Sequence, residues 1–224
     1  MAETVQKEDF VELEYTARVK ETKQVFDTTD EKTAKDAGIH NEKATYKPVT
    51  ICLGEGHLLK GLDRALLGKE IGKKHTVTVN PEEGFGRKNT KLIQLIATQK
   101  FLKQGIQPMP GLQVNIDGIF GMIKNVSGGR TLVDFNHPLA GQVLEYEVKL
   151  NRKVTDKKEK VKALAHLVLQ EDAEIEVKEN SVTVKTNEAV QKETAERLKE
   201  SIQKLIPSFT AVEMQQKKEA KGKQ

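Results

Sequence analysis

Two widely separated segments of the chain share one alternation of apolar and polar residues. The pattern occupies residues 11–19 and returns at residues 146–150. Alternation with a period of two is typical of strands that bury one face. Because the same one-sided pattern resumes so far along the chain, we expect the stretch between to contain an insertion into a single sheet domain. Further short strands are predicted at residues 24–27, 49–53 and 74–79.

Two short helices are predicted beside this sheet. Thr28 followed by Glu31 forms a capping-box pattern, and Gly38 ends the helix that this pattern opens. A second helix is indicated by leucines at every fourth position before a glycine: Leu58, Leu62, Leu66 and Gly68. Five strands with two helices predict an α+β domain.

The middle of the chain has a different character. Pro108 and Pro110 interrupt it, and two glycines separate the apolar segments 122–126 and 130–135, as in a β-hairpin. We expect an inserted, small β-rich domain over residues 88–137. The sheet domain then comprises residues 1–87 and 138–152 and is discontinuous in sequence.

The last third reads as helix, strand, strand, helix and strand. The apolar positions that define its two helical faces are Val161, Leu164, Ala165 and Val168 in one, and Ala195, Leu198, Ile202 and Leu205 in the other. A C-terminal domain of type αββαβ is expected over residues 153–214. Its helices pack either on their own strands or on a second copy of the chain, which would make a homodimer. Residues 215–224 are predicted to be disordered because they offer nothing to bury.

The charge balance excludes several partners. Lys and Arg number 37 against 33 Asp and Glu, too small an excess to make nucleic acid the default partner, although most of the excess lies in the last third.

No apolar run approaches the roughly 18 residues that a membrane span requires, so we expect a soluble protein. A single cysteine and an N-terminus without a signal-peptide core favour the cytoplasm.

The usual signatures of reactive or metal sites are missing. The glycines of residues 54–61 are spaced wrongly for a dinucleotide fingerprint. The five histidines are scattered, with no pair at the spacing of a helical zinc site. Cys52 lies within an alternating strand, which is typical of an inert buried thiol. We therefore expect neither a metal nor a cofactor.

Four spaced blocks carry a family resemblance: EYTARVKETKQVFDTT, VTICLGEGHLLKGLDRALLG, VTVNPEEGFG and VDFNHPLAGQVLEYEV. In this order they closely resemble the FKBP-type peptidyl-prolyl cis-trans isomerases. The resemblance implies an FKBP-like fold, an antiparallel sheet wrapped on a short helix. The insertion followed by NHPLAG is similar to the SlyD subtype, whose insert lies in the flap, and the third domain resembles that of the long archaeal members. The tail lacks the His and Cys clusters that bind nickel in small SlyD-type proteins.

The resemblance implies a site for a proline ring. Its catalytic residues would be Asp27, Tyr15, Phe26, Phe85 and Tyr146, and its other substrate-binding residues Val49, Leu58, Leu59 and Leu62. On the residues alone, Asp27 is a turn carboxylate before a helix; the resemblance makes it a buried carboxylate beside the prolyl bond. Leu62 replaces the Trp floor of the best-known small members, and Phe85 replaces a frequent Tyr, which implies weaker binding of macrolides.

The insert is expected to hold unfolded, proline-containing chains by strand addition and apolar contact. Ile106, Met109 and Leu112 are its candidate contact residues; alternatively, they fill the insert's own core. The whole chain would then be a foldase and chaperone. Two alternatives remain: a holdase that keeps the pocket but has lost useful turnover, and a ribosome- or nucleic-acid-associated factor that uses the basic last third.

Overall fold

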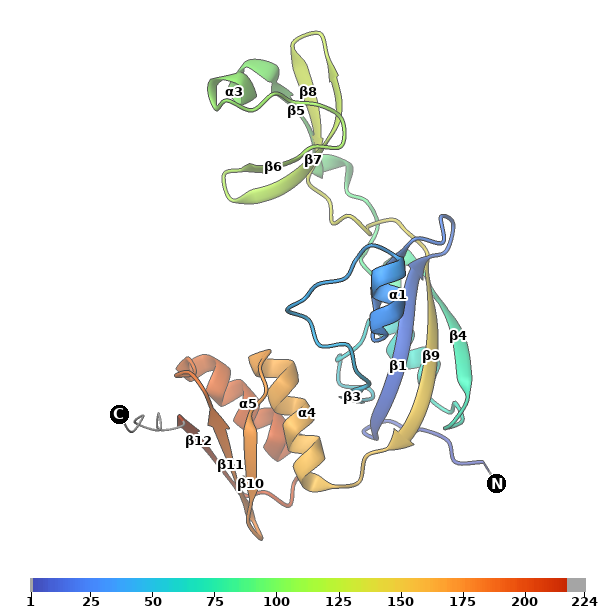
Figure 1. The fold of residues 1–224 in the computed structure, drawn as a ribbon, viewed down its shortest axis with the longest axis vertical. Helices are drawn as coiled ribbons and strands as arrows, with labels where there is room; N and C mark the ends of the chain where they lie inside the picture. Colours follow the sequence, from blue (N-terminus) through green and yellow to red (C-terminus); the bar gives the residue numbers. More distant parts are fainter. Residues whose placement is uncertain (1, 217–224) are drawn as a thin grey trace. The chain divides into compact units, whose positions relative to one another are not determined.

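A computed structural model describes residues 2–216, which form two compact units. Within the described residues, one unit spans residues 2–78 and 145–216, and the other spans residues 79–144. Figure 1 shows the order of the elements, and each unit is described by itself. None of the helices within residues 2–216 combines the length and the apolar character needed to cross a membrane.

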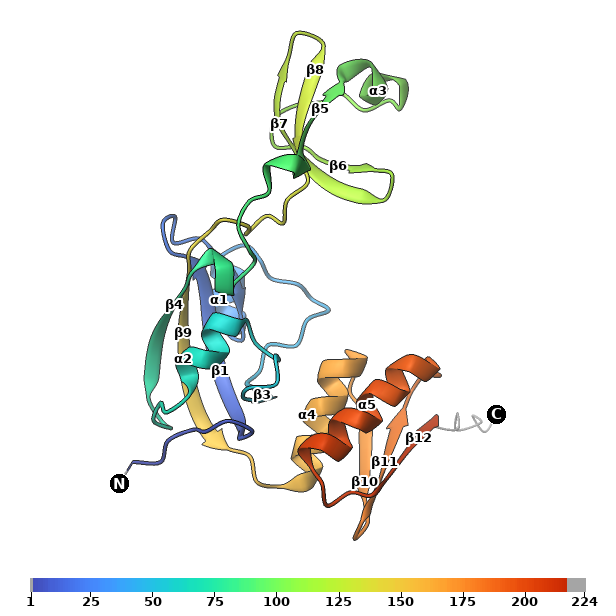
Figure 2. The ribbon, with the colours of Figure 1, turned by 180° about the vertical axis from the view of Figure 1, so that it is seen from behind.

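The first unit is built on a five-stranded antiparallel sheet. Its path is β2-β1-β9-β4, with β3 also paired to β1. The strands are β1 (Phe10–Val19), β2 (Val25–Thr28), β3 (Val49–Cys52), β4 (Lys74–Val79) and β9 (Leu144–Lys153). Helix α2 (Lys60–Leu66) lies against one face of this sheet (Figure 2), where it buries Leu62 and Leu66. The α+β prediction and the return of the sheet at residue 146 are confirmed.

The first helix begins differently from the prediction. Helix α1 covers Glu31–Asp36, and its N-cap is Asp30, whose carboxylate accepts from the Thr33 amide at 2.7 Å. The predicted cap, Thr28, is wrong because its hydroxyl donates to the Tyr15 carbonyl oxygen at 3.1 Å, within the β1–β2 pair. Gly38 follows the helix at a φ of +68°, which confirms it as the stop signal.

The C-terminal domain is the predicted αββαβ arrangement. It consists of α4 (Lys157–Leu169), β10 (Glu174–Val177), β11 (Ser181–Thr186), α5 (Lys192–Leu205) and β12 (Ala211–Gln216). Strand β11 is central, antiparallel to β10 and parallel to β12. Both helices cover one face of this sheet (Figure 1). Strand β12 reaches two residues into the predicted disordered tail; the rest of that tail, residues 217–224, lies outside the described residues.

The second unit carries a four-stranded antiparallel sheet in the order β5-β8-β7-β6. It contains the single-turn helices η1 (Pro81–Glu83) and η2 (Thr90–Leu92), then β5 (Ile93–Ala97), α3 (Thr98–Lys103), β6 (Gln113–Ile116), β7 (Ile119–Ser127) and β8 (Arg130–Asp134). The glycine-linked hairpin is confirmed as β7–β8. We call these four strands the insert sheet. Phe101, Val114, Ile123 and Val133 form its core.

Candidate prolyl site

Three aromatic side chains gather on adjacent strands of the five-stranded sheet. Tyr15 lies on β1, Phe26 on β2 and Tyr146 on β9. The ring of Tyr146 lies 6.1 Å from the ring of Tyr15 and 6.1 Å from that of Phe26, against which it packs edge to face. Such tilted contacts are favourable for aromatic rings. The structure thus brings together three of the residues that the resemblance implied.

Asp27 touches this cluster through one hydrogen bond. The Tyr15 hydroxyl donates to Asp27 Oδ2 at 2.7 Å. Contrary to the expectation of a buried carboxylate, Asp27 is exposed, because β2 is an edge strand of the sheet and its alternation turns Asp27 toward solvent. The exposed Asp27 carboxylate thus contacts the aromatic cluster through its hydrogen bond with Tyr15.

Both tyrosines keep their protons strongly. Burial, together with the hydrogen bond to Asp27, raises the pKa of Tyr15 well above its ordinary value. Burial and the nearby Asp27 charge raise the pKa of Tyr146 to about 12. At neutral pH both hydroxyls are therefore neutral, and the Tyr15 hydroxyl acts as a hydrogen-bond donor to Asp27.

This proton binding predicts a loss of stability in alkali. Unfolded tyrosine titrates near 10, and the folded state holds the Tyr146 proton up to about 12. The contribution of the raised Tyr146 pKa to the free energy of unfolding is therefore complete below pH 10 and is lost as the pH rises from 10 to about 12. Tyr146→Phe should remove part of this loss when denaturant unfolding of both proteins is compared across that range. Parallel pH curves for the two proteins would contradict the assignment.

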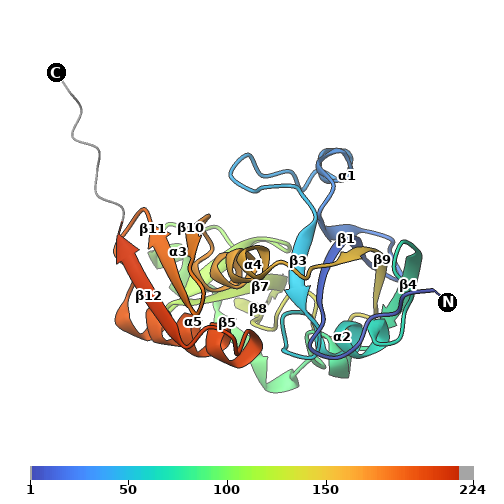
Figure 3. The ribbon, with the colours of Figure 1, turned by 90° about the horizontal axis from the view of Figure 1, so that it is seen from below.

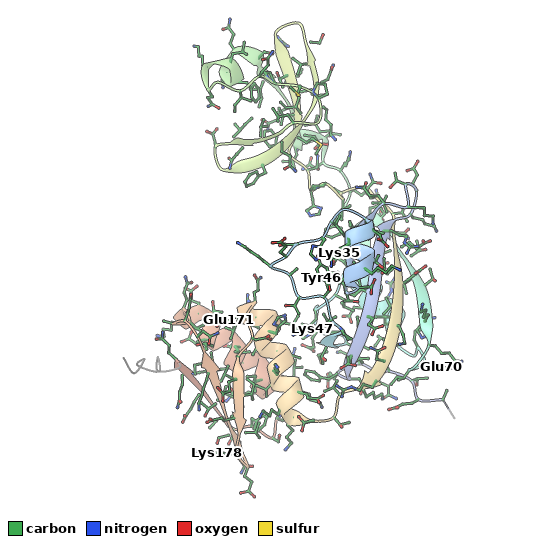
Figure 4. All side chains as sticks on the ribbon, in the orientation of Figure 1. Lys35, Tyr46, Lys47, Glu70, Glu171 and Lys178 are labelled. Carbon is green, nitrogen blue, oxygen red and sulfur yellow. The ribbon has the colours of Figure 1, made fainter. Side chains whose placement is uncertain are left out.

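A cleft of about 300 Å³ opens beside the aromatic cluster. The predicted residues Tyr15, Phe26, Asp27 and Val49 line it. The loop between α1 and β3 supplies most of the remaining lining residues, which are Ile39, Asn41, Ala44, Thr45, Tyr46 and Lys47. Tyr46 and Lys47 are labelled on this loop in Figure 4. The cleft thus combines a strand wall with a loop wall.

The loop wall was missed by sequence reasoning. Tyr46 is held there by a ring stack on His40, at 5.3 Å between ring centres, and its hydroxyl accepts from the Asn41 amide at 2.9 Å. Ile39 is half-buried. Neither residue belongs to a strand or a helix, so periodicity gives no signal for them.

A larger cleft, of about 580 Å³, shares Tyr15, Thr29, Tyr46 and Lys47 with the first. Its remaining lining is mostly charged or polar and includes Glu14, Arg18, Asp30, Glu31, Lys74, Glu147 and Lys149. A proline ring gains little from such surroundings, because they stay hydrated. The smaller, aromatic cleft is therefore the candidate site.

The three predicted leucines lie at the start of α2, outside the lining of the smaller cleft. Leu62 is buried on the helix, whereas Leu58 and Leu59 are half-buried just before it. The loop that carries them is fixed internally: the Cys52 amide donates to His57 Nδ1 at 3.0 Å, and the Gly54 amide donates to both Asp63 oxygens at 2.9 and 3.0 Å.

The remaining predicted site residues lie in the second unit. Phe85 is half-buried, and its ring stacks on His137 with 4.4 Å between centres. Ile106 and Leu112 pack against the core of the insert sheet, whereas Met109 is 56% exposed. The alternative that these residues fill the insert's own core therefore describes two of the three. Further exposed apolar side chains of this unit, not predicted from the sequence, are Leu92, Leu95, Leu102, Ile119 and Phe120.

Cys52 and the acidic residues suggest no reactive centre. Burial raises the pKa of the Cys52 thiol to about 12, which leaves it protonated and unreactive. Within residues 2–216, no three His, Cys, Asp or Glu side chains are grouped so that they could hold a metal ion.

Comparison with known proteins assigns the chain to a family. Residues 1–103 match the family model of the FKBP-type peptidyl-prolyl cis-trans isomerase, and residues 94–139 match that of the FKBP26 IF domain. The chain is 33% identical over 150 residues to the short-type peptidyl-prolyl cis-trans isomerase of Methanocaldococcus jannaschii, a match that spans 67% of this chain and 94% of that one.

Two bacterial relatives match more narrowly. The FKBP-type 16 kDa peptidyl-prolyl cis-trans isomerase of Escherichia coli is 36% identical over 109 residues, which cover 46% of this chain and 72% of that one. The FKBP-type isomerase SlyD of Haemophilus influenzae is 33% identical over 120 residues, 51% of this chain and 62% of that one. With its aromatic cleft and its matching insert, this chain is a SlyD-like member of the FKBP-type peptidyl-prolyl cis-trans isomerase family.

Proposed function

We propose that the protein rotates X-Pro bonds in unfolded or partly folded polypeptides and holds these clients with its insert. The proposal that the insert holds clients rests on the distribution of exposed apolar side chains. Of the nine large hydrophobic side chains exposed in the described residues, six lie within residues 79–144. Exposed apolar groups gathered on one small unit mark an interaction surface.

The cleft supports rotation without acid, base or metal. Conjugation in an amide opposes rotation by roughly 18 to 20 kcal/mol, and it is broken in the twisted transition state. The carbonyl is then less polar than in the planar amide, so water stabilises the planar form more. Walls such as Phe26 and Val49 displace that water and thereby favour the twisted form. Each 1.36 kcal/mol removed from the barrier gives about a tenfold faster rate.

Asp27 has an assisting role in this proposal. Its carboxylate lies at the cleft and accepts the Tyr15 hydroxyl, so it fixes the ring that forms part of the wall. The charge also acts on the carbonyl dipole as that dipole weakens during rotation. The role is electrostatic and orienting, and it involves no proton transfer.

The client surface includes one face of the insert sheet, which carries two of the six exposed apolar side chains, Leu95 and Phe120. Strand register places Leu95 opposite Leu132, and Met122 opposite Asp134, on the face away from core residues such as Val133. Phe120, two residues before Met122 on β7, shares this face by alternation and is 72% exposed. A stripe of Leu, Met and Phe side chains that differ in shape accepts many apolar sequences.

Tethering explains why such a surface helps catalysis. A chain held on the insert meets the prolyl site of the same molecule at an effective concentration in the millimolar range. Prolines that would rarely reach the cleft by diffusion are then presented repeatedly. Short peptides do not contact both regions, so they gain nothing from the insert.

We also propose a cytosolic location. The one cysteine of the chain is buried and protonated, so the fold of the described residues needs no disulfide and tolerates a reducing compartment. Detection of the native protein in a cytosolic fraction, free of membranes, tests this point, and its recovery with another compartment would contradict it.

Phe120→Ser tests the client surface. Phe120 contributes little to the core, so the variant should unfold at the same denaturant concentration and should turn over proline tetrapeptides normally. Loss of one aromatic contact should weaken its binding to a permanently unfolded client about fivefold or more. Val177→Ser is the matched control, because Val177 is also an exposed apolar residue, 40% accessible, on β10. Equal client binding by the two variants would contradict the assignment.

A further inference from the structure

The C-terminal domain shares a hydrophobic core with the isomerase sheet. Phe10 and Cys52, on β1 and β3, belong to the same buried cluster as residues of α4, α5 and the C-terminal strands. The Val154 amide donates to the Phe10 carbonyl oxygen at 2.7 Å, and Lys160 of α4 lies 5.1 Å from the centre of the Phe10 ring. Figure 3 shows α4 beside β3. This continuous core makes the C-terminal domain an integral part of the first unit.

The strand that the C-terminal domain contacts leads directly into the segment that carries two of the predicted substrate-binding residues. Cys52 ends β3, and residues 53–59 connect it to α2; we call them the β3–α2 loop. Leu58 and Leu59, to which the family resemblance gave a role in substrate binding, end this loop. Its beginning is held by the bonds of Cys52 to His57 and of Gly54 to Asp63.

Glu55 of this loop forms a salt bridge with the C-terminal domain. Its side chain is only 12% exposed, and its carboxylate accepts a hydrogen bond from Lys204 in the last turn of α5. A carboxylate that is nearly buried is costly unless it is paired with a cation. Glu8 and Asp63 add negative charge to the same surroundings. Without Lys204, the loop would have to move outward to hydrate Glu55.

A second contact of the C-terminal domain reaches the loop wall of the cleft, between α1 and β3. Lys47, which lines the cleft, lies 3.8 Å from Asp172 on the connection between α4 and β10. Both side chains are well exposed, and such a pair contributes little on its own. With this ion pair, the loop before β3 and the loop after β3 both contact the C-terminal domain.

We propose that the C-terminal domain positions the β3–α2 loop of the prolyl site, and that Lys204 is the residue through which it does so. Lys204 is a positioning residue, since it acts through Glu55 and not on the substrate. The inference rests on the proposed function and on the roles in proline binding that the family resemblance implied for Leu58 and Leu59. It assigns the C-terminal domain a part in catalysis that is independent of client binding by the insert.

The test is a charge exchange in the full-length protein. Lys204→Glu should lower kcat/KM for a proline tetrapeptide about five- to tenfold, the size expected for the loss of one typical hydrogen bond. The double variant Glu55→Lys with Lys204→Glu restores the pair and should recover most of that loss. Lys192→Glu is the matched control: it makes the same charge change on α5, where Lys192 pairs with Glu196 of its own helix. Full activity of Lys204→Glu, or no recovery in the double variant, would overturn the proposal.

Amide hydrogen exchange provides a readout that a purely global destabilisation would not reproduce. In Lys204→Glu the Cys52 and Gly54 amides should exchange faster, while the amide of Leu13, in the middle of β1, keeps its wild-type rate. Uniformly faster exchange would instead indicate general loss of stability and would refute a positioning role. The activity of the wild-type protein separates the two proposals. If the wild-type protein does not turn over the tetrapeptide, the proposed function is contradicted. If the wild-type protein is active and the Lys204 variants are equally active, only the inference about Lys204 is contradicted.

Discussion

Replacing residues 88–134 with a short glycine-rich turn is expected to leave tetrapeptide turnover unchanged and to slow the catalysed refolding of a proline-limited protein by roughly a hundredfold. The expected size follows from the effective concentration that tethering supplies, which raises apparent affinity by about 10²- to 10⁴-fold. The deletion is feasible because the Gly141 amide donates to the Gly86 carbonyl oxygen at 2.8 Å, so the entering and leaving chains already lie side by side. Phe85 and its stacking partner His137 are retained.

Two assays on one sample decide this prediction. A protease-coupled assay on a tetrapeptide reports the prolyl site alone, and refolding of a client whose slow phase is prolyl isomerisation reports capture and rotation together. Phe120→Ser in the intact chain should fall between the two proteins in refolding. If the deleted form refolds the client as fast as the intact protein, the insert has no part in catalysis on proteins.

The substitution Asp27→Leu is expected to reduce kcat/KM on a tetrapeptide by about tenfold or more, with little effect on stability because Asp27 is exposed. The carboxylate fixes Tyr15 through the 2.7 Å hydrogen bond, and its charge acts on the rotating carbonyl. Tyr15→Phe removes the same bond and keeps both the ring and the charge, so it should lose less activity.

Combining the two changes separates orientation from charge. If Asp27 acts mainly by holding Tyr15, the double variant should lose no more than Asp27→Leu alone, since both changes remove one shared interaction. Additive losses would assign independent roles to the two residues. Undiminished turnover of a folded Asp27→Leu protein would remove Asp27 from the mechanism.

Period-two alternation was enough to predict the two long strands of the main sheet, including the return of the sheet at Tyr146. The short strand predicted at residues 74–79 has the observed bounds. The aromatic cluster required the family resemblance as well, because alternation places Tyr15 and Tyr146 on buried faces without showing that they meet. The predicted N-cap of α1 was wrong because the Thr28 hydroxyl is already hydrogen-bonded within the sheet, and Asp30 caps the helix instead.

Other features depend on contacts that no local pattern contains. Tyr46 lies in an irregular loop, and its place in the cleft is set by His40 and Asn41. The exposure of Phe120 depends on strand register in the insert sheet, which shifts between Ile123 and Asn125. The bond between Glu55 and Lys204 joins residues separated by 149 positions.

Magnetisation exchange between the cis and trans forms of a short prolyl peptide tests the proposed catalysis most directly. Uncatalysed exchange takes tens to hundreds of seconds. With catalytic amounts of the folded protein, exchange should become fast on the timescale of the NMR measurement, and Asp27→Leu should slow it. A rate that stays at the spontaneous value in the presence of correctly folded protein would contradict a water-excluding cleft that promotes rotation.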